Sequence, residues 1–216
     1  GIGVDGGMAD ELVVSPDCVV PLPDGLEVRD ASLVEPVACA VRAMHRAKVE
    51  PGQRVAVVGG GTLGIAAVAA AVHLGCDVGI AARHPHQLAA AEAVGGRPAE
   101  GHYDVVVEAA GTGSAFDAAL GLARVQGTVA LLGTYWGEIT VGALPIGIKE
   151  LDLVGCLAYG RHDDVREVDQ AAGLLAAVPE LARALITHRF PLDDAPEAFR
   201  VAADRRAGAI KVTLEP

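Results

Sequence analysis

Residues 54–64 read RVAVVGGGTLG, an apolar run followed by a glycine-rich turn. The run Arg54–Val58 predicts a buried strand, and Thr62–Leu74 predicts a helix that Gly75 ends. Between them, the glycines fit the G-x-G-x-x-G pattern, which in a strand–turn–helix unit is typical of dinucleotide binding. The first glycine permits the tight turn, the second lets a pyrophosphate approach backbone N–H groups, and the third lets helix and strand pack closely. The residues assigned to this site are Gly59, Gly60, Gly61, Thr62, Leu63 and Gly64. The alternative is a glycine-rich connection without a ligand.

Strand and helix patterns alternate on both sides of this unit. Strands are expected at residues 54–58, 78–81, 103–109, 128–132 and 151–156, and helices at 37–47, 62–74, 85–94 and 114–124. Apolar runs without polar alternation, each followed by a helix, indicate a parallel sheet covered on both faces. Residues 95–103 leave room only for a stub strand at 97–100 and for no helix. The fold class is therefore α/β, with a Rossmann-type doubly wound parallel sheet.

The two ends of the chain do not continue the alternation of strands and helices. Short strands are expected at residues 13–14 and 18–20, where nearby prolines confine them to an edge or to loops. After Gly160, helices are expected at 165–177, 181–186 and 195–205, an extended piece at 188–190 and a final strand at 209–214. A lone final strand after helices is expected to pair with the early strands. We therefore assign residues 1–35 and 161–216 to one domain and residues 36–160 to the nucleotide-binding domain.

The end of the second strand predicts which coenzyme is bound. About twenty residues after Gly61, where a carboxylate would bind the ribose of NAD, the chain has Ala82 followed by Arg83 and His84. A guanidinium offers a planar fork for phosphate, so this segment predicts NADP(H). A charge-assisted contact of about 1.5–3 kcal/mol gives a preference of roughly one to two decades over NAD(H). The alternatives are a solvated Arg83 and a plain loop at His84 and His86, which have no third metal ligand nearby.

Composition narrows the function classes. The 216 residues include 17 Lys and Arg against 28 Asp and Glu, a net charge of −11 that disfavours nucleic acid and anionic membranes as partners. The four cysteines lie far apart, which is typical of reduced thiols in a cytoplasmic protein. Residue 1 is Gly rather than Met, and the first residues do not resemble an N-terminal start. We therefore expect the chain to be the C-terminal part of a longer protein.

Several stretches, taken in order, resemble one family. They are residues 6–13 (GGMADELV), 33–38 (LVEPVA), 51–59 (PGQRVAVVG), 103–112, 127–135, 149–155 and 209–214. In these the chain resembles the medium-chain, zinc-type alcohol dehydrogenase superfamily, nearest to its threonine, sorbitol and polyol dehydrogenase branch. The resemblance implies that the terminal unit is the remainder of a GroES-like β-barrel catalytic domain, into which the nucleotide-binding domain is inserted.

The resemblance also assigns site residues. Glu35 falls where that branch places a glutamate beside, or coordinated to, the catalytic zinc; the alternative is a capping box formed with Ser32. The lining of the nicotinamide and ribose site is assigned to Ala110, Gly111, Gly133, Thr134 and Tyr135; the alternative is that these are the small residues with which any buried strand ends. Lys211 matches a basic position that reaches the coenzyme pyrophosphate from the final strand; the alternative is an exposed lysine.

The function that the resemblance implies is hydride transfer between a secondary alcohol or polyol and NADP, assisted by zinc in the intact enzyme. The family's remaining zinc ligands lie upstream of any residue here, so the chain alone is expected to assemble no metal site and to be inactive. The expected partners are a small alcohol or ketone and a second copy of the chain. A zinc-free quinone reductase, a non-catalytic NADP(H)-binding protein and a purely structural role stay open as alternatives.

Overall fold

The computed structural model describes residues 6–9, 11–204 and 206–215. Its centre is a six-stranded sheet with the order β3-β2-β1-β4-β5-β6, in which every pairing is parallel. The strands are β1 (Arg54–Val58), β2 (Asp77–Ala81), β3 (Arg97–Pro98), β4 (Tyr103–Glu108), β5 (Ala123–Leu131) and β6 (Asp152–Gly155). The direction of winding reverses between β1 and β4, which is where open α/β sheets bind their ligands. The predicted α/β class and parallel sheet are confirmed.

Helices cover both faces of this sheet, with α1, α2 and α3 in the core on one face and α4 in the core on the other. The helices that the structure describes are α1 (Val34–Arg46), α2 (Thr62–His73), α3 (Pro85–Glu92), α4 (Gly113–Leu122), α5 (Leu144–Ile148), α6 (Glu167–Ala177), α7 (Pro179–Leu185) and α8 (Ala195–Ala203). Val55 and Val57 of β1 belong to a core shared with α1, α2, α3, α6 and α7, whereas Ala56 and Val58 belong to a second core with α4. Because side chains alternate along a strand, this all-apolar run fills both cores at once.

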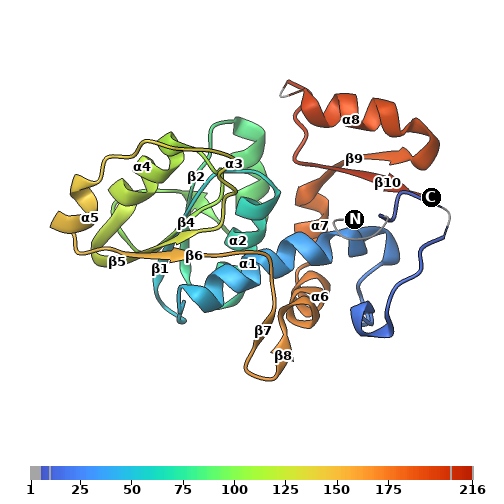
Figure 1. The fold of residues 1–216 in the computed structure, drawn as a ribbon, viewed down its shortest axis with the longest axis horizontal. Helices are drawn as coiled ribbons and strands as arrows, with labels where there is room; N and C mark the ends of the chain where they lie inside the picture. Colours follow the sequence, from blue (N-terminus) through green and yellow to red (C-terminus); the bar gives the residue numbers. More distant parts are fainter. Residues whose placement is uncertain (1–5, 10, 205, 216) are drawn as a thin grey trace.

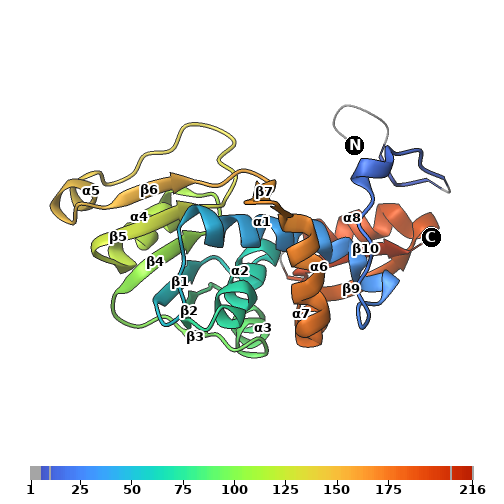
Figure 2. The same cartoon turned by 90° about the horizontal axis from the view of Figure 1, so that it is seen from below.

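A second, smaller sheet lies apart from the first (Figure 1). It consists of β9 (Ile186–Pro191) and β10 (Lys211–Glu215), which pair in parallel, with α8 packed against both. As expected, the final strand β10 does not extend the large sheet. The expected pairing with early strands is wrong, because β10 pairs with β9. The early residues still lie beside this sheet in both views (Figures 1 and 2), since Asp30 forms an ion pair with Arg189 of β9.

The other differences from the predicted elements are local. The strands predicted at residues 13–14 and 18–20 are wrong: the region has a 3-10 turn, η1 (Pro16–Cys18), because its prolines cannot donate to a strand partner. A second 3-10 turn, η2 (Val28–Leu33), precedes α1, and a third, η3 (Leu192–Asp194), precedes α8. A short hairpin of β7 (Arg161–His162) and β8 (Val165–Arg166) occupies the predicted start of α6, and α5 was not predicted.

The helix predicted at residues 195–205 ends at Ala203, and Arg205 lies outside the described residues. The stub third strand is present as β3, with no helix between it and β4. Within the described ranges no helix is long and apolar enough to cross a membrane. The division of the chain into two domains at residues 35 and 160 stays a prediction.

Candidate functional site

A cavity of about 520 Å³ lies at the carboxyl ends of β1, β2 and β4. Its wall contains six of the predicted site residues: Gly59, Gly60, Gly61, Arg83, His84 and Ala110. The sheet brings these together because parallel strands end at the same edge. The wall also contains residues that sequence reasoning did not assign, namely His86 and Gln87 at the start of α3, Thr112 and Ser114 at the start of α4, and Ala209 before β10. For the four residues at the helix starts, the available signal was their position soon after a strand end; Ala209 had no such signal.

The glycine turn is shaped by close contacts that a side chain would disturb. Gly59 has φ of +114°, a conformation that favours glycine, and a Cβ there would come within 3.0 Å of the Ala110 Cβ. A Cβ on Gly60 would lie 2.5 Å from the Gln87 Cβ. A Cβ on Gly64 would overlap the carbonyl oxygen of Gly59, so the first turn of α2 packs directly on the glycine turn.

Gly61 differs from its neighbours because the space in front of it is open. A Cβ there would meet no heavy atom within 4 Å, and Gly61 is the N-cap residue of the twelve-residue helix α2. Among the described residues, no side chain caps the N-terminal N–H groups of α2. These groups carry the positive end of the helix dipole and face a cavity, which is an arrangement that suits a phosphate.

Basic and imidazole groups lie at the end of β2. Arg83 is exposed and lines the cavity, and the structure gives it no ion pair with any described residue. The rings of His84 and His86 are stacked with centroids 5.5 Å apart, and the His84 backbone N–H donates to Gln87 Oε1 at 3.3 Å. Ala82 lies between the strand and this cluster but outside the cavity wall. The guanidinium is therefore free to meet an anion in the cavity.

The ends of β4 and β5 are joined by a buried acid that sequence reasoning missed. Glu108 has no solvent-exposed surface, and its Oε1 accepts hydrogen bonds from the N–H groups of Ala110 and Gly111 at 2.8 and 2.9 Å. Its Oε2 accepts one from the Tyr135 hydroxyl at 2.5 Å. Burial raises the pKa of the Tyr135 phenol above its usual range, and the bond to Glu108 raises it further. The signal in the sequence was a single carboxylate inside the apolar run 105–110.

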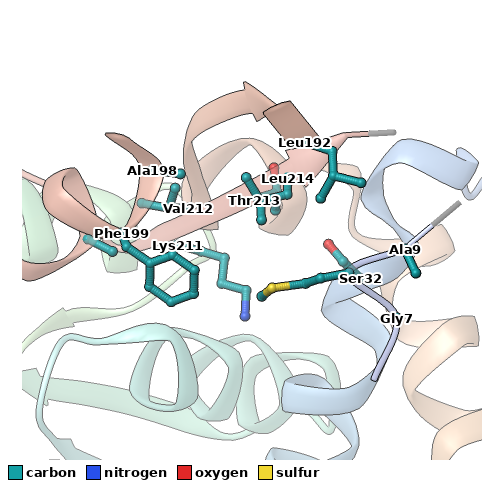
Figure 3. Close-up of a pocket in the computed structure, with 12 residues that line it drawn as sticks. Gly7, Ala9, Ser32, Leu192, Ala198, Phe199, Lys211, Val212, Thr213 and Leu214 are labelled. Atoms are coloured by element: carbon teal, nitrogen blue, oxygen red, sulfur yellow. The ribbon is translucent and has the colours of Figure 1, made fainter. Parts of the chain in front are cut away.

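Several predicted residues lie outside the cavity wall. They are Thr62, Leu63, Gly64, Ala82, Gly111, Gly133, Thr134, Tyr135 and Lys211. The Thr62 hydroxyl donates to the Ile210 carbonyl at 3.0 Å, which connects the start of α2 to the segment before β10. Lys211 lines a second cavity, of about 350 Å³, whose wall is mostly apolar. In the view of Figure 3 its side chain extends between Phe199 and Ser32.

Glu35 lies in the first turn of α1, exposed to solvent. Its Oε1 accepts a hydrogen bond from the Cys39 thiol at 3.5 Å; burial and then the charge of Glu35 raise the pKa of that thiol to about 12. The capping-box alternative is wrong, because the N-cap residue is Leu33 and no side chain caps α1. Among the described residues, no group of three His, Cys, Asp or Glu side chains could hold a metal. Since zinc sites take three or four protein ligands, these residues alone do not fit zinc.

Comparisons with known proteins agree with this geometry. Residues 62–173 match the sequence profile of the family described as zinc-binding dehydrogenase. The chain is 29% identical to sorbitol dehydrogenase from Gallus gallus, over 98% of this chain and 63% of that protein. It is similar in structure to galactitol-1-phosphate dehydrogenase from Escherichia coli, with a TM-score of 0.86 and 26% identity over 98% of this chain and 67% of that one.

A further solved structure, a zinc-binding dehydrogenase from Sinorhizobium meliloti 1021 bound to NADP, has a TM-score of 0.83 and 26% identity. The match covers 98% of this chain and 66% of that one. The chain spans between 62% and 65% of the length of the first curated relatives it matches. The matched relatives are therefore longer proteins than the chain described above.

Proposed function

The chain belongs to the zinc-binding dehydrogenase family, and from this premise we propose that it is the coenzyme-binding part of an NADP(H)-dependent alcohol dehydrogenase. The substrate class proposed for the whole protein is a secondary alcohol or polyol, or the corresponding ketone. The sorbitol and galactitol-1-phosphate dehydrogenases among the relatives support this class. When bound, the coenzyme supplies a hydride acceptor or donor.

The open space at Gly61 carries the proposal. The cavity in front of it is lined by backbone and by Arg83, and it lies at the winding reversal of the sheet. The N–H groups at the start of α2 would hold the pyrophosphate, and the small side chains of Ala109 and Ala110 leave room beside it. The described residues therefore fit a dinucleotide, and their part is to bind and orient it.

Zinc belongs to the proposal only for the intact enzyme. Glu35 is the one predicted metal ligand in this chain, and its carboxylate is exposed and free to reach a partner supplied by other residues of a longer protein. The described residues do not form a zinc site by themselves, so the other ligands would come from the rest of the longer protein.

Arg83 is proposed to select NADP(H) by its contact with the 2′-phosphate. Arg83→Ala is expected to weaken NADPH binding by about 10- to 100-fold, the loss of one charge-assisted hydrogen bond, and to leave NADH binding unchanged. Titration of both coenzymes by calorimetry measures this. Arg183→Ala is the matched control, because Arg183 is an exposed arginine on α7 whose ion pair is with Glu180. Unchanged or tighter NADPH binding by Arg83→Ala would show that the phosphate is held elsewhere.

A second copy of the chain is the proposed partner. Strand β6 ends the sheet order, so one of its edges has no partner strand in the part of the chain that the structure describes. Apolar side chains are exposed around it, including Leu153 on the strand, Leu157 after it and Ile148 before it. An open edge beside exposed apolar groups is a surface that pairs with another chain. This supports a homo-oligomer built through β6.

The cytoplasm is the proposed location. All four cysteines are free thiols in the structure: Cys18 lies in η1, Cys39 in α1, Cys76 just before β2 and Cys156 just after β6. Free thiols persist in reducing compartments. The test is to alkylate the protein directly in its native source and to count the modified cysteines by mass spectrometry. Four modified cysteines are expected for a protein kept in a reducing compartment.

A further inference from the structure

We propose that Glu108 and Tyr135 form a positioning pair that holds one wall of the coenzyme cavity in place. The pair joins two backbone turns: the β4 turn, residues 109–111, and the β5 turn, residues 132–135. This inference rests on the proposed function, since it concerns how the same cavity receives its coenzyme. Neither side chain lines the cavity itself, so the pair acts through the backbone that it holds.

Glu108 is the centre of the arrangement. Its carboxyl group holds the β4 turn through the N–H groups of Ala110 and Gly111, and its main-chain oxygen holds the β5 turn by accepting from the N–H groups of Leu132 and Gly133, at 2.8 and 2.9 Å. A fully buried carboxyl group is costly unless its oxygens are satisfied. Here two N–H groups of the β4 turn and the Tyr135 phenol satisfy it.

Tyr135 closes the arrangement from the β5 turn. Its hydroxyl donates to Glu108 Oε2 at 2.5 Å, and its ring packs edge-on against Phe116 of α4 with centroids 6.1 Å apart. The raised pKa of the phenol keeps it protonated, so it stays a donor at neutral pH. Tyr135 is therefore directed at Glu108 rather than into the cavity.

The two turns are packed too closely to move independently. A Cβ on Gly133 would lie 2.5 Å from Glu108 Oε2 and would overlap the Gly111 N–H. A Cβ on Gly111, whose φ is +66°, would overlap the Thr134 carbonyl oxygen. A displacement of one turn must therefore displace the other.

Displacement would reach the coenzyme through Ala110. Ala109 and Ala110 form part of the cavity wall. The Ala110 side chain is so close to the glycine turn that a Cβ on Gly59 would lie 3.0 Å from the Ala110 Cβ. The β4 turn thus packs directly against the glycine turn in the cavity wall, while Arg83 lies at the end of β2, on the other side of β1. Loosening the pair is expected to disturb the coenzyme near the β4 turn and to leave the phosphate contact at Arg83 intact.

Two ligands separate these effects: NADPH, and adenosine 2′,5′-bisphosphate, which has the phosphorylated adenosine half alone. Tyr135→Phe removes one hydrogen bond and is expected to weaken NADPH binding by about 3- to 10-fold, with the bisphosphate within twofold of wild type. Dissociation constants by calorimetry and melting temperatures by circular dichroism are measured on the same samples. In a Glu108→Gln background the same change is expected to have a smaller effect, because the coupling is already altered.

Tyr103→Phe is the matched control. Tyr103 is buried at the opposite end of β4, and its hydroxyl accepts a hydrogen bond from the Glu100 N–H at 2.8 Å. This variant is expected to lower the melting temperature without changing the affinity for either ligand. A purely structural Tyr135 would behave in the same way, and that result would overturn the positioning pair.

The outcomes also separate this inference from the proposed function. Wild-type protein that binds neither ligand would overturn both. Wild type that binds both, with Tyr135→Phe weakening neither or weakening both equally, would overturn the positioning pair alone. If Tyr135→Phe does not fold, Glu108→Gln decides, because it keeps an acceptor for the β4 turn and is expected to weaken NADPH selectively; unchanged NADPH binding by Glu108→Gln would then overturn the pair.

Discussion

Gly61 and Gly64 lie three residues apart, and glycine is needed at the two positions for different reasons. Gly64 is required by the protein's own packing, because a Cβ there would overlap the Gly59 carbonyl oxygen. A Cβ added to Gly61 would meet no heavy atom within 4 Å, and the φ of −82° at this residue suits any amino acid. Neither packing nor backbone conformation therefore explains a glycine there. The proposed coenzyme would explain it, since a pyrophosphate close to the backbone leaves no room for a methyl group.

Alanine at the two positions therefore gives opposite results. Gly61→Ala is expected to keep the wild-type melting temperature and to lose at least tenfold in NADPH affinity, about 1.4 kcal/mol, because its methyl group occupies the phosphate position. Gly64→Ala is expected to lower the free energy of unfolding by about 1–3 kcal/mol through overpacking. Thermal melts and coenzyme titrations of both variants make the measurement. A Gly61→Ala variant that binds NADPH as wild type does would place the pyrophosphate elsewhere.

Among the elements, α1 and α6 are joined by a second buried acid. Glu167, at the start of α6, has no exposed surface; its Oε1 lies 2.8 Å from His45 Nδ1 and 3.4 Å from an Arg42 nitrogen, both on α1. Its Oε2 accepts from the Gly160 N–H at 2.6 Å, next to the β7–β8 hairpin, whose His162 ring stacks on His45. One carboxylate thus connects two helices and a hairpin.

The pH dependence of stability follows from this carboxylate. Burial alone would raise the pKa of Glu167, but hydrogen bonds from His45, Gly160 and Arg42 outweigh burial and hold it below its ordinary value of 4.5. A depressed folded-state pKa contributes stability above pH 4.5 that is lost as pH falls through the folded value. Glu167→Gln is expected to lower the free energy of unfolding by about 1–3 kcal/mol at pH 7.

Urea unfolding of wild type and Glu167→Gln at several pH values measures this difference, which is expected to shrink as the solution is acidified below pH 4.5. Glu180→Gln is the matched control, because Glu180 forms an exposed ion pair with Arg183 and its loss is expected to cost less than about 1 kcal/mol. A difference that stays constant from pH 7 into acid would mean that Glu167 does not contribute through its charge.

At the scale of the whole molecule, contacts between distant residues bring the small sheet to the coenzyme cavity. Thr62 at the start of α2 donates to Ile210, and Ala209 forms part of the cavity wall, although both partners lie more than 140 residues further along the chain. Arg189 of β9 pairs with Asp30 and with Glu215 of β10, which holds the early segment against the small sheet. The cavity is therefore bordered by the large sheet and by the segment that leads into β10.

Assembly is the remaining property at this scale. Static light scattering after gel filtration is expected to give twice the chain mass of 21.9 kDa. Leu157→Glu, beside β6, is expected to shift the protein toward monomer, because it places like charges at the proposed interface. Val28→Glu, an equally exposed apolar position on η2, is the control and is expected to leave the mass unchanged. A wild-type monomer at micromolar concentration would contradict pairing through β6.

Local sequence was enough to predict the large sheet. The strand β1 is found at the residues that its apolar run indicated, and α2 begins at the predicted Thr62, because strand and helix periods and glycine turns are short-range properties. The same reasoning predicted the stub at β3 and the carboxyl-end position of the glycine turn. The terminal strands before residue 20 were predicted wrongly, since a strand requires a partner and local pattern does not supply one.

The sequence by itself thus determined the parallel α/β sheet, the glycine turn and the cation after β2, each of which depends on neighbours within a few residues. Only the tertiary structure decided that Glu108 meets Tyr135, that Glu167 meets Arg42 and His45, that β10 pairs with β9, and that Lys211 lines the second cavity. These contacts join residues 24 or more positions apart, and the burial that makes them strong exists only once the chain has folded.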